Sequence, residues 1–225
     1  MKNLLIVPMV ISAALCAATA NAGLISGTDF TNGLNSQSFD SGFVTATSTN
    51  GNFKKKTVDT YTAVGVSGGR TGGEIDLDES IKLTFANDVN IDSFTLAFLY
   101  NGPEFNDVLE VAQVSVMTAT GIQTGTLTTN LVEDQATWAF GGNTFDITAV
   151  EGTQKGDDAV WQVTLGFGDL NVSSIEFGAV AGVCGAGCGN QSDYSLGAVA
   201  YSVPEPGALA LLGLGLIGLG VARRR

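Results

Sequence analysis

The sequence predicts an all-β protein: a two-sheet β-sandwich of jelly-roll type, flanked by an N-terminal signal peptide and a C-terminal transmembrane helix. Apolar and polar side chains alternate in many short segments, as is typical of strands with one buried face. Turn signals rich in glycine and asparagine separate these segments. No stretch of the body shows a sustained helical period. About 180 residues suffice for one domain with a sizeable core.

The individual strands follow from this alternation. Trp161, Val163, Leu165 and Phe167 give the clearest pattern. Similar apolar sets lie within residues 81–85, 94–100, 112–116, 145–149 and 175–177. Turn residues occur between them at 50–51, 68–69, 101–103 and 141–143. Roughly ten short strands punctuated in this way favour a sandwich.

The N-terminal segment, residues 1–22, has the three parts of a signal peptide. A short basic start, Met1-Lys2, precedes an apolar core, and Ala20-Asn21-Ala22 forms an A-x-A cleavage site before Gly23. We therefore expect signal peptidase to cut between Ala22 and Gly23. The sequence then divides into a signal peptide, a β-domain over residues 23–202 and a C-terminal segment over residues 203–225.

The C-terminal segment also has three parts. It begins with Val203, Pro204, Glu205 and Pro206. An uncharged run of 16 residues, 207–222, follows and would span about 24 Å as a helix, near the lower limit for a hydrocarbon core of about 30 Å. The chain then closes with Arg223, Arg224 and Arg225, which the positive-inside bias places on the cytoplasmic side.

The order of these three parts resembles the PEP-CTERM sorting signal of bacterial proteins handled by exosortase, a membrane transpeptidase-like enzyme. The resemblance covers about a tenth of the chain. It implies export, transient retention in the inner membrane, processing near residues 203–206, and release to the cell surface or an exopolysaccharide matrix. Pro204, Glu205 and Pro206 would be a recognition site for another enzyme. The alternative for this segment is an ordinary C-terminal membrane anchor.

Charge and composition limit the classes of function. The segment 23–203 contains six basic and 21 acidic side chains, so it is more acidic than the precursor with its net charge of −12. Such a charge favours solubility and argues against binding nucleic acid through a general field. The chain has no histidine, which excludes Ser-His-Asp and Cys-His catalysis and the usual zinc sites. We expect no enzymatic activity.

The most suggestive polar cluster is the acidic run 74–79. In an extended strand, Glu74, Asp76 and Asp78 would project from one face and repel one another unless a cation or solvent neutralised them. Oxygen-rich clusters suit Ca²⁺, so these three are candidate ligands of a structural calcium ion. The alternative is a solvated entrance to a strand. The glycine-rich stretch 65–73 lacks a GK[ST] ending and is interpreted as a loop.

Two further groups of residues have structural and functional interpretations. Cys184 and Cys188 are predicted to form a disulfide across a glycine-rich loop in an oxidising compartment. Trp138 and Trp161 alternate with apolar neighbours, which favours core packing over stacking on sugars. The basic run 54–56 is expected on an exposed strand that protects a sheet edge, with contact to an anionic polysaccharide as the alternative.

We therefore expect an exported, non-catalytic cell-surface or extracellular-matrix protein of the biofilm type. Its expected partners are exosortase, signal peptidase, the inner membrane and extracellular polysaccharide, without nucleic acid. A calcium-dependent carbohydrate-binding module is the main alternative, and a glycoside hydrolase is a remote one.

Overall fold

The structure, a computed structural model, describes residues 22–101, 107–132, 134–150, 152, 158–184 and 192–204. These residues belong to one compact unit, Asn21–Pro204. Their strands are β1 (Ala22–Ser26), β2 (Ser36–Phe39), β3 (Val44–Thr49), β4 (Phe53–Val58), β5 (Tyr61–Val66), β6 (Ser80–Ala97), β7 (Asp107–Thr118), β8 (Gly121–Thr129), β9 (Gln135–Phe140), β10 (Asn143–Thr148), β11 (Trp161–Thr164), β12 (Val172–Cys184) and β13 (Ser195–Ser202). Two 3₁₀ turns, Gly27–Asp29 and Asp40–Gly42, complete the elements of the described residues. The predicted all-β class is confirmed.

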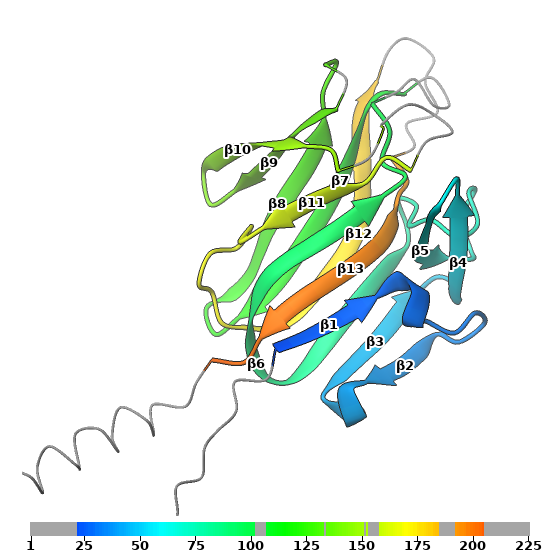
Figure 1. The fold of residues 1–225 in the computed structure, drawn as a ribbon. Coiled ribbons are helices and arrows are strands. Elements are labelled where there is room, and N and C mark those ends of the chain that lie inside the picture. Colours follow the sequence, from blue (N-terminus) through cyan, green and yellow to red (C-terminus); the bar gives the residue numbers. More distant parts are fainter. Residues whose placement is uncertain are drawn as a thin grey trace, which may run out of the picture. The chain divides into compact units, whose positions relative to one another are not determined.

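The strands form two sheets that share the long strand β6 (Figure 1). The first half of β6 pairs with β12 and β3 in one sheet, which continues through β7, β8 and β9 to β10. The second half pairs with β13 and β11 in the other sheet, which continues through β5 to β4. All of these pairings are antiparallel. Hydrogen bonding is thus continuous from β10 to β4, although the strands lie in two layers.

The core lies between the two sheets because alternate side chains of each strand point inward. Ile81 and Leu83 on β6 are fully buried, whereas Lys82 between them is not. Phe94 contacts Trp138 and Phe177 edge to face, with ring centroids 5.2 and 5.9 Å apart. Aromatic contacts of this kind add about 0.5–1.5 kcal/mol each to the free energy of burial.

The structure differs from the predicted strand pattern in three places. The 161–167 set, predicted as the clearest strand, forms a strand only as far as Thr164, and the Leu165 side chain is 60% exposed. The sets at 81–85 and 94–100 belong largely to one strand of 18 residues, because no glycine or proline interrupts residues 86–93. The 145–149 set was expected to present a buried face, but the Phe145 side chain is 53% exposed. Strand β10, which carries Phe145, is the terminal strand of the hydrogen-bonded order.

Candidate functional site

A pocket lined by carboxylates lies where the chain passes from β5 to β6. We call it the carboxylate pocket; its lining residues are Asn50, Gly68, Gly69, Arg70, Asp76, Leu77, Asp78 and Glu79, and its volume is about 240 Å³. The connection that builds it doubles back on itself. The Val66 N–H donates to the Glu74 carbonyl at 2.9 Å, and the Gly73 N–H donates to the Val66 carbonyl at 2.8 Å. The glycine-rich loop is thereby held against the acidic run.

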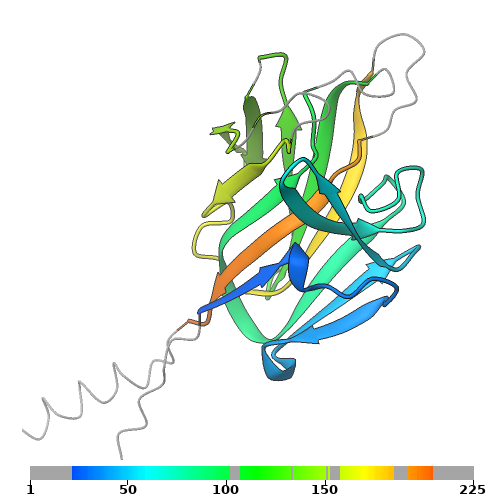
Figure 2. The same ribbon diagram turned by 45° about the vertical axis from the view of Figure 1, so that its right-hand side comes forward.

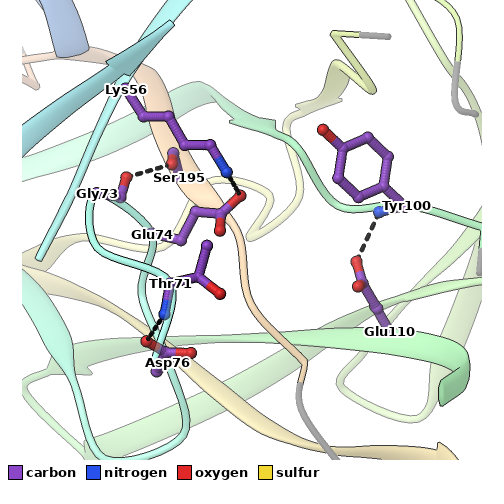
Figure 3. Close-up of polar contacts among 8 residues, drawn as sticks. All are labelled: Lys56, Thr71, Gly73, Glu74, Asp76, Tyr100, Glu110 and Ser195. Atoms are coloured by element: carbon purple, nitrogen blue, oxygen red, sulfur yellow. Dashed lines mark hydrogen bonds and ion pairs between the residues drawn. The ribbon is translucent and has the colours of Figure 1, made fainter. Parts of the chain in front are cut away.

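Asp76 and Glu79 are the two buried acids of this pocket, with 7% and 4% of their surfaces exposed. They lie at the two ends of one turn, in which the Glu79 N–H donates to the Asp76 carbonyl at 2.9 Å. In return, the Asp76 N–H donates to Glu79 Oε2 at 3.1 Å. The Thr71 N–H donates to Asp76 Oδ2 at 3.3 Å (Figure 3). Each carboxylate therefore has one oxygen committed to backbone donors.

The second oxygen of each carboxylate is buried without a hydrogen-bond partner. These atoms are Asp76 Oδ1 and Glu79 Oε1. Burying a carboxylate oxygen without a hydrogen-bond partner is costly, because the oxygen has lost its water. The backbone amides of Gly68 and Gly69 approach the Glu79 carboxylate and offset part of this cost. The backbone therefore compensates the burial of the two carboxylates only in part.

The electrostatic environment of the pair reflects this burial. Loss of hydration raises the pKa of Glu79, and the neighbouring charge of Asp76 raises it further, while the amides of Asp76, Gly68 and Gly69 partly oppose the rise. Burial also raises the pKa of Asp76, against the amides of Thr71 and Arg70 and the positive charges of Arg70 and Lys56. Both acids hold a negative charge less readily than they would in water.

The glycines of the loop allow this close approach. A Cβ atom on Gly68 would overlap the Asn50 carbonyl oxygen and lie 2.8 Å from Glu79 Oε1. A Cβ atom on Gly69 would overlap Asp76 Oδ2. The predicted interpretation of residues 65–73 as a loop rather than a phosphate-binding motif agrees with this arrangement, since the loop packs on carboxylates.

The three predicted calcium ligands do not share one face. Glu74 is 1% exposed, and its carboxylate forms an ion pair with Lys56, with Nζ 2.8 Å from Oε1 (Figure 3). Asp78 is exposed, because the chain turns at 77–78 instead of continuing as a strand. In the described part of the chain, no three side chains of the Asp, Glu, Cys or His types cluster as metal ligands. The structure brings Asp76 together with Glu79, which the period-two argument placed on the opposite face.

Other buried carboxylates serve backbone donors elsewhere. The Tyr100 N–H donates to Glu110 Oε2 at 2.6 Å (Figure 3), and the Tyr61 N–H donates to Asp158 Oδ1 at 3.1 Å. Glu110 is fully buried and Asp158 is 5% exposed. No local sequence pattern distinguishes such acids, since the backbone group that each one binds lies in another segment of the chain.

The tryptophans lie in the core, as predicted. Trp138 is 1% exposed and Trp161 is fully buried. Their indole N–H groups donate to the carbonyls of Gly166 and Leu99, at 2.9 and 2.8 Å. Neither ring offers a face for stacking on a sugar.

The lysine run lies on β4, the strand at the other end of the hydrogen-bonded order. This position agrees with the predicted edge strand. Lys54 is exposed, whereas Lys56 turns toward Glu74 and lies 5.6 Å from the centre of the Phe98 ring. One of the three lysines is therefore part of the packed structure.

The two ends of the domain meet in a single pair of strands, β1 and β13 (Figures 1 and 2). Ala22 lies opposite Ser202, and Gly23 lies opposite Tyr201. A Cβ atom on Gly23 would overlap the Tyr201 ring, which is buried and donates a hydrogen bond to Asp40. The predicted signal-cleavage point and the start of the C-terminal segment thus lie side by side.

Val203 continues beyond β13 and still packs against the core. The other predicted processing and anchor residues (Ala20, Glu205, Pro206, Arg223, Arg224 and Arg225) lie outside the described residues. Cys188 does as well, so its disulfide with Cys184 stays a prediction. Within the residues that the structure covers, no helix has the length and apolar character needed to cross a membrane.

Comparison with known proteins identifies the C-terminal segment. No curated protein matches the chain. Among solved structures, a DUF4465 family protein from Bacteroides ovatus ATCC 8483 aligns with 82% of this chain and 100% of its own, at 9% identity and a TM-score of 0.34. A TM-score this low supports no argument about fold or function.

Residues 202–225 match the model of the PEP-CTERM protein-sorting motif. The match begins at the last residue of β13, so the sorting motif follows the folded domain directly. Such a motif implies an exported protein that exosortase processes and that has a membrane-associated C-terminal tail. The chain therefore carries a PEP-CTERM sorting motif at residues 202–225, and its central β-domain is not assigned by a family model.

Proposed function

We propose that this chain is a non-catalytic protein of the cell surface or extracellular polysaccharide matrix, which exosortase releases by processing near residues 203–206. The observation that carries this proposal is the direct passage from β13 into the sorting motif. A folded domain without a linker before the motif is itself the cargo. The tail and the signal peptide are then handling elements, and the β-domain is the delivered product.

The surface chemistry of the β-domain suits an extracellular environment. Its 21 acidic side chains against six basic ones keep it soluble and repel other anionic polymers over long range. A matrix role would therefore use local contacts or bridging cations rather than general attraction to an anionic polysaccharide. Lys54 on the β4 edge is one exposed cation available for such a local contact.

The carbohydrate-binding alternative has weaker support from the described residues. Both tryptophans, the side chains best suited to stacking on sugar rings, are buried in the core. A glycan array with the exported protein tests this alternative. Saturable binding to one defined sugar would replace the structural role with a recognition role.

Processing can be tested by mass spectrometry of the released protein. In cells that contain exosortase, we expect a product that ends near residues 203–206 and lacks the three terminal arginines. Glu205→Ala should retain the tail and stay with the membrane fraction. Asp169→Asn, which removes an exposed acid from the domain, serves as the control and should be released normally.

Two results would contradict the proposal. One is a wild-type protein that keeps its arginine cluster in exosortase-containing cells. The other is equal release from cells that lack exosortase.

A further inference from the structure

We propose that the carboxylate pocket is a binding site for a calcium-type divalent cation, with Asp76 and Glu79 as its charged ligands. The ion would fasten the glycine-rich loop at 68–70 to the turn that begins β6. This inference goes beyond the proposed function, because it concerns the folded domain and holds wherever the chain is delivered.

The buried, unpartnered oxygens are the first support. Asp76 and Glu79 are each more than nine-tenths buried, and both line the same pocket. Backbone donors satisfy Asp76 Oδ2 and Glu79 Oε2, but Asp76 Oδ1 and Glu79 Oε1 have no hydrogen-bond partner. The two carboxylates are three residues apart on one turn, and each buries one oxygen that has no hydrogen-bond partner. Together they offer two hard oxygen ligands to one ion.

Charge balance is the second support. Two ionised carboxylates neutralise one divalent ion, so binding removes the mutual repulsion that burial intensifies. Asn50 and Asp78 line the same pocket and add oxygen atoms at its border. A volume of about 240 Å³ leaves room for an ion together with the waters that complete its shell.

The ligand set favours calcium over magnesium and predicts modest affinity. Ca²⁺ accepts six to eight oxygens in flexible geometry, whereas Mg²⁺ demands a near-ideal octahedron. Arg70, an exposed residue at the same pocket, opposes a cation electrostatically through its effect on Asp76. With two charged ligands and this positive neighbour, we expect a dissociation constant on the order of 0.1–1 mM, as in extracellular calcium modules.

A shared proton is the competing solution for the same pair. If Asp76 and Glu79 stay partly protonated at neutral pH, the pocket needs no metal ion. Calcium and protons would then act differently on stability, since only calcium gives a saturable rise at fixed pH.

The test is thermal unfolding of the exported protein, purified from its host, stripped with EDTA and dialysed at pH 7. Addition of about 10 mM CaCl₂ should raise the melting temperature by roughly 3–6 °C in a saturable manner. The same concentration of MgCl₂ should raise it much less. Glu79→Gln and Asp76→Asn, which keep the side-chain shapes, should each abolish the calcium-specific rise.

Asp146→Asn is the matched control. It removes one carboxylate from exposed β10 and should leave the calcium response unchanged. A wild-type protein without a calcium-specific shift would overturn the proposal. So would an equal shift in the Glu79→Gln variant, because the ion would then bind elsewhere.

Amide exchange locates the effect even if one variant folds poorly. Calcium should slow exchange of the backbone amides at 68–71 in the wild-type protein and leave those of β8 unchanged. Equal slowing throughout the molecule, or none at the loop, would count against the pocket.

Discussion

Gly68 shows how a single missing side chain shapes the pocket. Its Cα approaches the Asn50 carbonyl so closely that a Cβ atom would overlap the oxygen, and Glu79 Oε1 would lie 2.8 Å from the added atom. Turn chemistry alone predicted a glycine-rich loop at this place. Turn chemistry did not identify the neighbours that require glycine. Asn50 lies before β4 and Glu79 lies just before β6, so both are distant from the loop in sequence or belong to another turn.

Gly68→Ala should therefore destabilise the domain by about 1–3 kcal/mol, the usual cost of forcing an added atom into a packed site. Chemical denaturation monitored by tryptophan fluorescence measures the change. Gly178→Ala is the matched control, because its Cβ would meet only the Glu79 carbonyl oxygen at 3.6 Å. Equal losses in both variants would show that the close contact at 68 has no special cost.

The pKa of Glu79 gives a prediction about pH. Because burial raises this pKa above its unfolded value, the protonated form supplies stability that is fully present below about pH 4 and is lost as pH rises through the folded pKa. In the presence of EDTA, the Glu79→Gln variant should not lose this stability as pH rises. Its melting temperature, relative to wild type, should rise between pH 4 and pH 7. A difference that stays constant over this range would contradict the raised pKa.

At the scale of elements, β4 combines an exposed edge with one buried contact. Alternation and the lysine run predicted an edge strand, and β4 does end the hydrogen-bonded order. Lys56 nevertheless reaches Glu74 across the neighbouring connection, at 2.8 Å. A pattern of like charges cannot reveal which member will find a buried partner, because the partner approaches from another segment.

Lys56→Met should cost about 1–3 kcal/mol of stability, since it removes the ammonium group that pairs with the buried Glu74 carboxylate. We place the value below the full cost of breaking a buried pair because the Lys56 side chain is 28% exposed. Lys54→Met, at the exposed position two residues earlier on β4, should change stability by less than about 0.5 kcal/mol. Urea denaturation of the two variants compares them directly, and equal effects would refute the role of the Lys56–Glu74 pair.

At the scale of the whole domain, the pairing of β1 with β13 brings the predicted signal-cleavage point next to the strand that leads into the sorting motif. Ala22 lies opposite Ser202, so the predicted signal-cleavage point and the start of the sorting motif are neighbours. Sequence patterns predicted the two signals separately, because each is a short linear motif, and the C-terminal one is confirmed by the family model. Their adjacency arises from long-range strand pairing across nearly the entire domain.

The sequence alone determined the properties that depend on local order. Period-two alternation predicts strands because successive side chains point to opposite faces, and the same alternation correctly placed Trp138 and Trp161 in the core. The C-terminal motif could also be recognised from the sequence, since a sorting motif is defined by the order of its residues along the chain. Tertiary structure decided which acids became a site. Alternation grouped Glu74, Asp76 and Asp78 on one face. In the structure, the turn at 77–78 brings Asp76 into contact with Glu79, and the loop at 68–70 lines the same pocket. A carboxylate's environment depends on which donors and charges the folded chain brings to it, and those lie outside its own segment.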